Sequence, residues 1–216
     1  MKQWRYYWEH HNEQAVIGLT AFFLFAGVVQ YAIGWRYVLA LTPLVIGILA
    51  ALTVLYWHAP AGVKAALFTI AFSIGMITEI IGVNSGVLFG DYWYGTILGL
   101  KIAGVPILVG ITWAYVTIAA WQLVSYSTFS VVGKIIIAAG VIVMFDLLLE
   151  QYATAFGLWQ WQDGIIPLKN YVTWFAVGIV LVSLYARYAQ QKKPSLYGAS
   201  VLPLTALFFW CMLLVR

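Results

Sequence analysis

The stretch VGKIIIAAGVIVMFDLLLEQYATA, residues 132–155, decides the fold class of this chain. It is long and apolar enough to cross the hydrocarbon core of a bilayer as a helix, which takes about 20 predominantly apolar residues. It nevertheless carries two carboxyl groups, Asp146 and Glu150, one helical turn apart on the same face. A charged side chain at the bilayer centre costs about 2.5–3.5 kcal/mol on insertion scales. The stretch therefore indicates a membrane helix in which the two acids have a functional role.

The composition of the whole chain agrees with a membrane protein. Of its 216 residues, 64% are hydrophobic and 8% are charged, whereas soluble domains average about 25% charged residues. Six further stretches are long and apolar enough to cross a bilayer: 14–33, 37–57, 64–83, 102–124, 170–190 and 197–215. We therefore predict an all-α, polytopic membrane protein with about seven transmembrane helices in one bundle over residues 14–215. The whole chain, 1–216, is predicted to be a single integral membrane domain.

The polar N-terminus and the loop charges predict how the chain sits in the membrane. Residues 1–13 read as an interfacial segment with aromatic side chains at headgroup level: Trp4, Tyr6, Tyr7 and Trp8. Lysine and arginine are enriched in cytoplasmic loops. With the N-terminus inside, the inner side holds Lys2, Arg5, Lys64, Lys134, Arg187, Lys192 and Lys193, and the outer side holds Arg36, Lys101, Lys169 and Arg216. We therefore predict a multi-pass protein of a bacterial or archaeal cell membrane, with a cytoplasmic N-terminus.

The sequence argues against several kinds of cofactor site. Its single cysteine, Cys211, and its histidines have no zinc-binding spacing. The glycine-rich loop lacks the ending of a phosphate-binding loop, and the last predicted span has no interior lysine for a retinal Schiff base. No basic run is long enough to bind nucleic acid. We therefore expect no metal, nucleotide, flavin or other cofactor, and no nucleic-acid partner.

Five acidic residues converge on one face of the membrane: Glu79, Asp91, Asp146, Glu150 and Asp163. Glu79, Asp146 and Glu150 lie in the second halves of the third and fifth predicted spans, which run in the same direction. No basic residue lies at similar depth in a span, so burial favours the neutral form of these carboxyl groups. A neutral carboxyl group beside an ionised one suits acid–base catalysis. The alternative is that these acids reach the interface or pair with Lys101 or Lys169.

Aromatic side chains cluster in the two loops that follow these spans. The first loop is rich in glycine, which lets the backbone fold back at membrane depth, and it carries Phe89, Tyr92, Trp93 and Tyr94. The second loop and the start of the sixth span carry Trp159, Trp161, Tyr171 and Trp174. Asn170 lies one turn before Trp174. An interfacial belt would explain each ring singly, but the rings together also suit a developing carbocation, through cation–π attraction of about 0.5–2 kcal/mol each.

The irregular spacing of these residues resembles that of the membrane-integral carotenoid biosynthesis protein family, which includes carotenoid 1,2-hydratases of the bisanhydrobacterioruberin hydratase type. The first matching block is Glu79, Gly82, Val83, Gly86, Phe89, Gly90, Tyr92, Tyr94, Gly99, Gly104, Val105, Pro106 and Trp113. The second block is Asp146, Glu150, Trp159, Trp161, Pro167, Asn170 and Trp174. One departure is Gln151, where the family commonly has proline after the second acid.

The resemblance implies a cofactor-independent hydro-lyase that adds water across the terminal C1–C2 double bond of an acyclic carotenoid end, as in lycopene or gamma-carotene. We expect Asp146 to protonate the alkene and Glu79 or Glu150 to act as the base for water. The resemblance also implies a substrate-binding set: Asn170, Trp174, Trp159, Trp161, Tyr92, Tyr94, Phe89 and Trp113. The partners are then a carotenoid, water and the membrane, and association with other carotenoid enzymes is a further expectation.

Two other functions fit the same residues. A carotenoid end-group cyclase would use the same protonation and let an internal double bond capture the cation. Polar residues close to the acids in sequence favour water, and thus hydration: Asn84, Asp91, Gln160 and Gln162. A proton-coupled transporter or lipid-binding protein would use the acids as a relay, but the inner halves of the spans are nearly devoid of ionisable partners. The sequence therefore ranks a hydratase first, a cyclase second and a transporter third.

Overall fold

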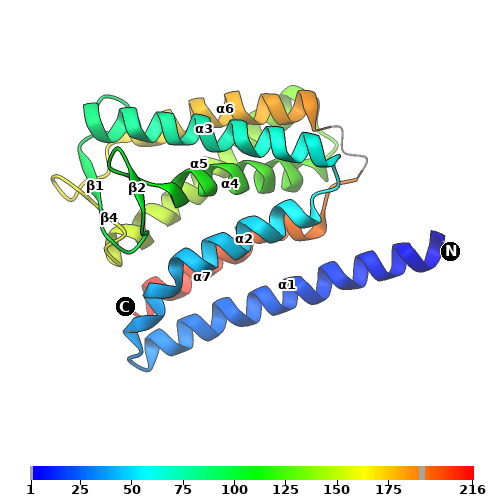
Figure 1. Ribbon diagram of the computed structural model, residues 1–216, viewed down its shortest axis with the longest axis horizontal. Helices are drawn as coiled ribbons and strands as arrows, with labels where there is room; N and C mark the ends of the chain where they lie inside the picture. Colours follow the sequence, from blue (N-terminus) through cyan, green and yellow to red (C-terminus); the bar gives the residue numbers. More distant parts are fainter. Residues whose placement is uncertain (1, 190–192) are drawn as a thin grey trace.

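Seven long helices form one bundle in the computed structural model of the protein, which describes residues 2–189 and 193–216, with side chains from residue 12 onward (Figure 1). The helices are α1 (Lys2–Ala32), α2 (Thr42–Tyr56), α3 (Ala61–Ser85), α4 (Ile107–Ser125), α5 (Val131–Ala155), α6 (Leu168–Tyr188) and α7 (Leu196–Leu214). A short 3-10 helix, η1 (Arg36–Leu41), continues into α2. Each span is long and apolar enough to cross a membrane. This confirms the predicted all-α, polytopic class.

Some of the sequence predictions concern residues whose side chains lie outside the described part of the structure. These residues are the aromatic side chains of the interfacial segment and some of the basic residues that predict the orientation: Trp4, Tyr6, Tyr7, Trp8, Lys2, Arg5 and Lys192. The orientation of the chain in the membrane therefore stays a prediction.

The helices run alternately between two ends of the bundle. We call one of them the acid end: it holds the loops 86–106 and 156–167 and the C-terminus (Figure 1). The other, the opposite end, holds the loops 57–60 and 126–130. Because α3 and α5 both run toward the acid end, the acids in their second halves are brought to one side of the molecule.

The fourth helix begins later than the predicted span 102–124. Residues 101–106 instead form a tight hairpin of β2 (Lys101–Ile102) and β3 (Val105–Pro106). Both turn residues have positive φ, 47° at Ala103 and 88° at Gly104, as a two-residue type I′ turn requires. The prediction was wrong here because hydropathy measures apolar content, and this apolar hairpin has no helical backbone.

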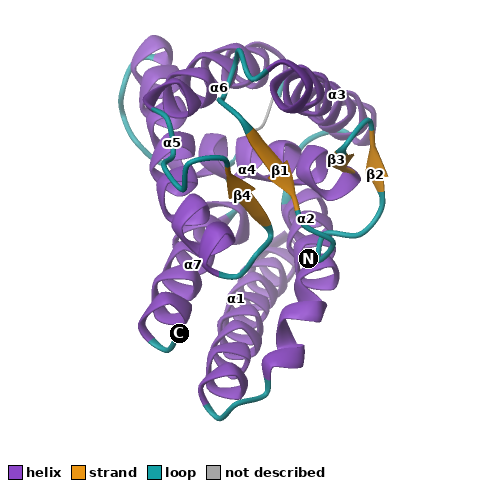
Figure 2. Ribbon diagram, turned by 90° about the vertical axis from the view of Figure 1, so that its left-hand side faces the viewer, coloured by secondary structure: helices purple, strands orange, loops and turns teal. Residues whose placement is uncertain are grey.

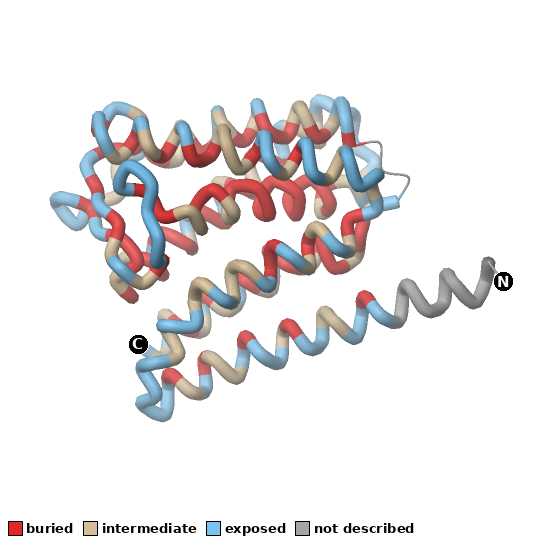
Figure 3. Tube along the Cα trace, viewed as in Figure 1, coloured by how far each residue is buried: buried red, intermediate tan, exposed pale blue. Residues whose placement is uncertain are grey.

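Helix α4 is the centre of the bundle. It packs against α2, α3, α5 and α7, and 72% of its apolar window is buried, against 17% for the span containing α2. In Figure 3 it is accordingly the helix with the most continuous buried trace. The outer helices therefore keep large apolar faces for lipid, and α4 supplies the fixed wall from which the site is built.

Two short strands join the loops at the acid end into a lid. β1 (Tyr92–Tyr94) pairs antiparallel with β4 (Trp159–Trp161), so that Tyr92 faces Trp161 and Tyr94 faces Trp159. Figure 2 shows this pair across the end of the bundle. Because side chains alternate along a strand, these four rings are buried and the residues between them are exposed. Two loops that are far apart in the sequence thus bring their four aromatic rings together at the acid end of the bundle.

Helix α1 is fastened to α7 at the opposite end. Glu13 Oε2 accepts hydrogen bonds from the backbone N–H of Tyr197, at 2.9 Å, and from Ser195 Oγ, at 3.3 Å. A carboxylate at this place satisfies the free donors of a helix N-terminus and complements its dipole. Glu13, which the sequence places in the interfacial segment, is therefore a buried link within the bundle.

Candidate active site

Three acids from two helices meet under the lid. Glu79 of α3 is 3% exposed, and on α5 Asp146 is 0% and Glu150 3% exposed. Lys101 and Lys169 donate instead to the backbone carbonyls of Tyr94 and Gly86, each at 2.6 Å. Among the described residues, no ion pair reaches any of the three acids. Any negative charge on these acids therefore depends on neutral hydrogen-bond donors for its stabilisation.

Glu79 has the richest set of donors. Its Oε2 accepts from the hydroxyl groups of Tyr92, at 2.6 Å, and Tyr94, at 2.7 Å, and its Oε1 accepts from Trp113 Nε1 at 3.0 Å. Burial, and secondly the charge of Glu79, raises the pKa of both tyrosine hydroxyls well above the usual value. The phenols therefore stay protonated and keep donating. Three donors on one carboxylate favour its ionised form.

Glu150 is held by the other strand of the lid. Trp159 Nε1 and Trp161 Nε1 donate to the same oxygen, Oε2, at 2.9 and 2.8 Å. No described residue donates to its Oε1, and Glu150 lines the cavity below the lid. The free oxygen of Glu150 is thus available to a molecule bound in that cavity.

Asp146 lies one helical turn before Glu150 on the same face of α5. Asn170 Nδ2 of α6 donates to Asp146 Oδ2 at 2.9 Å. Its other oxygen, Oδ1, is buried and has no hydrogen-bond partner among the described residues. A charge would be poorly stabilised in this position, since a buried polar atom without a partner is costly.

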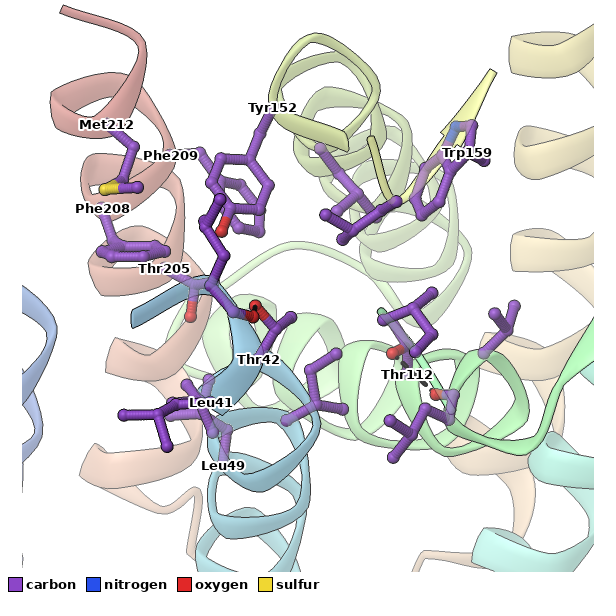
Figure 4. A pocket seen from close by; sticks show the side chains of 18 of the residues that line it. Leu41, Thr42, Leu49, Thr112, Tyr152, Trp159, Thr205, Phe208, Phe209 and Met212 are labelled. Atoms are coloured by element: carbon purple, nitrogen blue, oxygen red, sulfur yellow. Dashed lines mark hydrogen bonds between the residues drawn. The ribbon is translucent and has the colours of Figure 1, made fainter. Parts of the chain in front are cut away.

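Two of these acids, Glu79 and Glu150, line an apolar cavity of about 410 Å³. Figure 4 shows part of its wall, with Thr112, Tyr152, Trp159, Phe208 and Phe209 around the open space. Eight of the predicted site residues line it: Glu79, Tyr92, Tyr94, Glu150, Trp159, Trp161, Asn170 and Trp174. A space of this size is within the usual range of small-molecule sites, about 300–1,000 Å³.

The remaining predicted site residues stand behind this wall. Trp113 is fully buried and stacks on Trp174 with ring centroids 3.8 Å apart. Phe89 fills the space over Gly82, where a Cβ atom would lie 2.2 Å from its ring. Asp146 is covered as well. These three side chains support the residues that line the cavity.

Four polar residues that favoured hydration in the sequence do not line the cavity. Asn84 donates to the carbonyl groups of Ile80 and Ala103, and Gln160 donates to the carbonyl group of Thr154. Asp91 and Gln162 are exposed, as is Asp163, the other loop acid. The argument for water from these side chains was therefore wrong. Asn84 lies on the exposed side of α3, and the alternation of side chains along β4 turns Gln160 away from the site.

The sequence did not reveal the rest of the cavity wall. Tyr115, Leu149, Tyr152 and Leu158 line the cavity, as do residues of α1, α2 and α7. In a membrane helix, an apolar residue that faces a cavity looks the same in sequence as one that faces lipid.

No group of histidine, cysteine, aspartate and glutamate within the described residues could hold a metal ion.

Comparisons with known proteins find a family profile and a similar protein. The sequence profile described as carotenoid biosynthesis protein matches residues 38–216. Bisanhydrobacterioruberin hydratase of Haloarcula japonica is 28% identical over 133 residues, which cover 58% of this chain and 44% of that protein. The chain thus aligns with less than half of the length of that relative. No solved structure matches.

Proposed function

The chain belongs to the carotenoid biosynthesis protein family, and from this membership we propose that it is a cofactor-independent hydratase of an acyclic carotenoid end. The reaction is the addition of water across the terminal C1–C2 double bond, which gives a tertiary alcohol. One observation carries the proposal: buried carboxyl groups, which have no cationic partner in the part of the chain that the structure describes, lie at the covered end of an apolar cavity. The likeness to a protein named as a hydratase supports the choice of water as the reactant.

The pair of acids on α5 supplies the proton. Asp146 has one donor and an unpartnered buried oxygen, which suits a neutral carboxylic acid. Glu150 lines the cavity with its Oε1 free, so it is the member of the pair that reaches the alkene. A proton passes from this pair to C2 of the substrate, the π bond breaks, and a tertiary cation forms at C1.

Glu79 and the aromatic rings stabilise that cation and direct water to it. With three donors, Glu79 suits the ionised base. The rings of Trp161 and Trp174 line the same space and attract a cation through their π faces. A water molecule forms the C1–O bond and gives its proton to Glu79, which returns one proton to the α5 pair before the next turnover.

The test is pigment analysis by liquid chromatography and mass spectrometry in lycopene-producing bacteria that express the protein. Wild type should yield a pigment heavier by one water. Asp146→Asn, Glu150→Gln and Glu79→Gln should each lower the yield by about 100-fold or more, as expected for loss of an acid or base. Asp163→Asn is the matched control, because this acid is exposed in the lid loop.

Three outcomes would contradict the proposal. A product of unchanged mass with a shortened chromophore would identify a cyclase, in which an internal double bond captures the cation. Unmodified pigment with well-folded protein, across several acyclic substrates, would leave binding or transport. Full activity in all three acid variants would remove the acids from the chemistry.

A further inference from the structure

We propose that α1 forms, together with η1 and α2, a lateral opening toward the lipid, and that the polyene tail of the substrate lies in it. The inference rests on the proposed function, because it takes an acyclic carotenoid end to be at the acids. It assigns a binding role to a helix that the family profile does not cover, since the profile begins at residue 38.

The cavity at the acids is continuous with the space beside α1. The same cavity that is lined by Glu79 and Glu150 is also lined by Phe23, Ala26 and Gly27 of α1. From α1 the wall passes over η1 and α2 to α7, and Figure 4 shows the α2 and α7 side with Leu49, Phe208 and Met212. A linear apolar molecule with its reactive end at the acids would therefore run toward α1.

The acid end of the cavity is covered on the side of the loops. Tyr92 and Tyr94 of β1, and Trp159 and Trp161 of β4, are all at most 8% exposed. Their polar atoms are engaged by Glu79 and Glu150, so opening this side would break four hydrogen bonds to carboxyl groups. The lid therefore makes the loop side an unfavourable route for a large apolar substrate.

The rim at α1 and α2 is open and apolar. Phe23 is 67% exposed, Leu44 is 60% exposed and Leu41 is 48% exposed, although all three line the cavity. They belong to the spans Asn12–Ala32 and Arg36–Tyr56, so this exposed surface faces hydrocarbon in a membrane. A carotenoid is dissolved in hydrocarbon, and an opening at this depth receives it without passage through water.

Gly27 lines this opening, and a large side chain at its position on α1 would narrow it. A Cβ atom there would lie 3.7 Å from Phe208 Cε2 and 3.8 Å from Val38 Cγ2, in ordinary contact. A large side chain would extend from this point into the space between α1, η1 and α7. Gly18, on the same helix, is exposed, lies outside the cavity wall and has no atom within 4 Å of its Cβ position.

The experiment measures binding of lycopene to the purified full chain in lipid nanodiscs. Lycopene is achiral, so a visible circular dichroism band arises only from molecules held by the protein. Gly27→Phe should weaken binding at least tenfold, and Gly18→Phe, the matched control, should bind as wild type does. A second pair guards against misfolding of Gly27→Phe: Leu44→Trp should weaken binding as well, while Leu55→Trp, exposed on α2 and outside the cavity, should not.

Several results would overturn the inference. The first is that Gly27→Phe and Leu44→Trp both bind lycopene as wild type does, and the second is that they lose no more affinity than Gly18→Phe and Leu55→Trp. The third is that Leu44→Trp loses affinity while a well-folded Gly27→Phe does not. The fourth is that wild type itself shows no induced circular dichroism band. Product mass in the same samples reports separately on the proposed function. Binding that depends on Gly27 without a hydrated product would refute the hydratase proposal and leave the polyene site in place.

Discussion

The buried carboxyl groups of this protein differ mainly in the number of their donors. A hydrogen bond to a charged group contributes about 1.5–3 kcal/mol, and inserting a carboxylate into the bilayer costs about 2.5–3.5 kcal/mol. Three donors therefore offset a large part of the cost of burying an ionised Glu79. The single donor to Asp146 offsets it far less. This difference supports the proposed division of the acids into a base, Glu79, and a proton source on α5.

We predict that Asn170 positions Asp146 for the proposed reaction. Asn170→Ala removes the donor to Asp146 Oδ2, so we expect turnover of lycopene to fall by about tenfold or more, which corresponds to about 1.4 kcal/mol in the barrier. Thr173→Ala is the control: it lies on the same helix and loses a hydrogen bond to the Leu88 carbonyl group. Equal losses of turnover in both variants would mean that α6 packing, and not the aspartate, was disturbed.

The tyrosines of the lid predict how stability depends on pH. Their hydroxyl pKa is raised in the folded protein, against about 10 in the unfolded chain. Folded protein therefore binds these protons more tightly, and their contribution to stability is complete below about pH 10 and is lost as the pH rises further. The midpoint of thermal unfolding should thus exceed that of the double variant Tyr92→Phe, Tyr94→Phe by a constant amount up to about pH 10, and by less above it.

Tyr37→Phe serves as the control for this titration, because Tyr37 is 89% exposed. Its midpoint should follow that of wild type at every pH. A gap between wild type and the double variant that widened above pH 10 would contradict the assignment of the two hydroxyls as permanent donors.

Among the elements, the lid depends on close contact between two loops. The N–H of Gly95 donates to the Leu158 carbonyl group at 2.8 Å, and a Cβ atom at Gly95 would lie 2.4 Å from the Gly157 carbonyl oxygen. Because the neighbour is backbone, it yields only if the strands move apart. The pairing of β1 with β4 therefore requires glycine at this position.

Gly95→Ala should lower both stability and product yield. We expect a loss of about 1–3 kcal/mol, as for overpacking of a tight site, together with displacement of Tyr94 and Trp159 from the acids. Gly62→Ala, in α3 with open space around it, should be neutral or stabilise by about 1 kcal/mol. Thermal unfolding and pigment yield measure the two effects, and an unchanged yield in Gly95→Ala would show that the lid does not position the site.

At the scale of the whole molecule, α1 is held by its contact with α7 and by one buried acid. Glu13→Ala removes the acceptor at the N-terminus of α7, so we expect a loss of about 1–2 kcal/mol. His58 lies 3.6 Å from Glu13 but is 42% exposed, so His58→Ala should cost less than about 1 kcal/mol. Thermal unfolding measures both variants. Losses of equal size would mean that the ion pair, and not the helix cap, fastens α1.

The sequence by itself determined the membrane class, the seven helices and the side of the bundle on which the acids meet. These properties follow from local quantities: apolar length, the cost of charge in hydrocarbon, and the direction of successive spans. It also placed Glu79, Asp146 and Glu150 beside aromatic loops. The residues that donate to Glu79 and Glu150 were among the predicted site residues, but the acid that each of them contacts was not predicted.

The tertiary structure alone decided which donor meets which acid, and where the cavity lies. The pairing of Tyr92 with Trp161 joins loops that no local pattern connects, and the turn at Ala103 and Gly104 shortened a span that hydropathy had extended. Phe23 and Gly27 line a cavity, yet their sequence context is that of lipid-facing residues. Lipid and a polyene are equally apolar, so hydrophobicity cannot distinguish the two surfaces, and only the packing of α1 against its neighbours does.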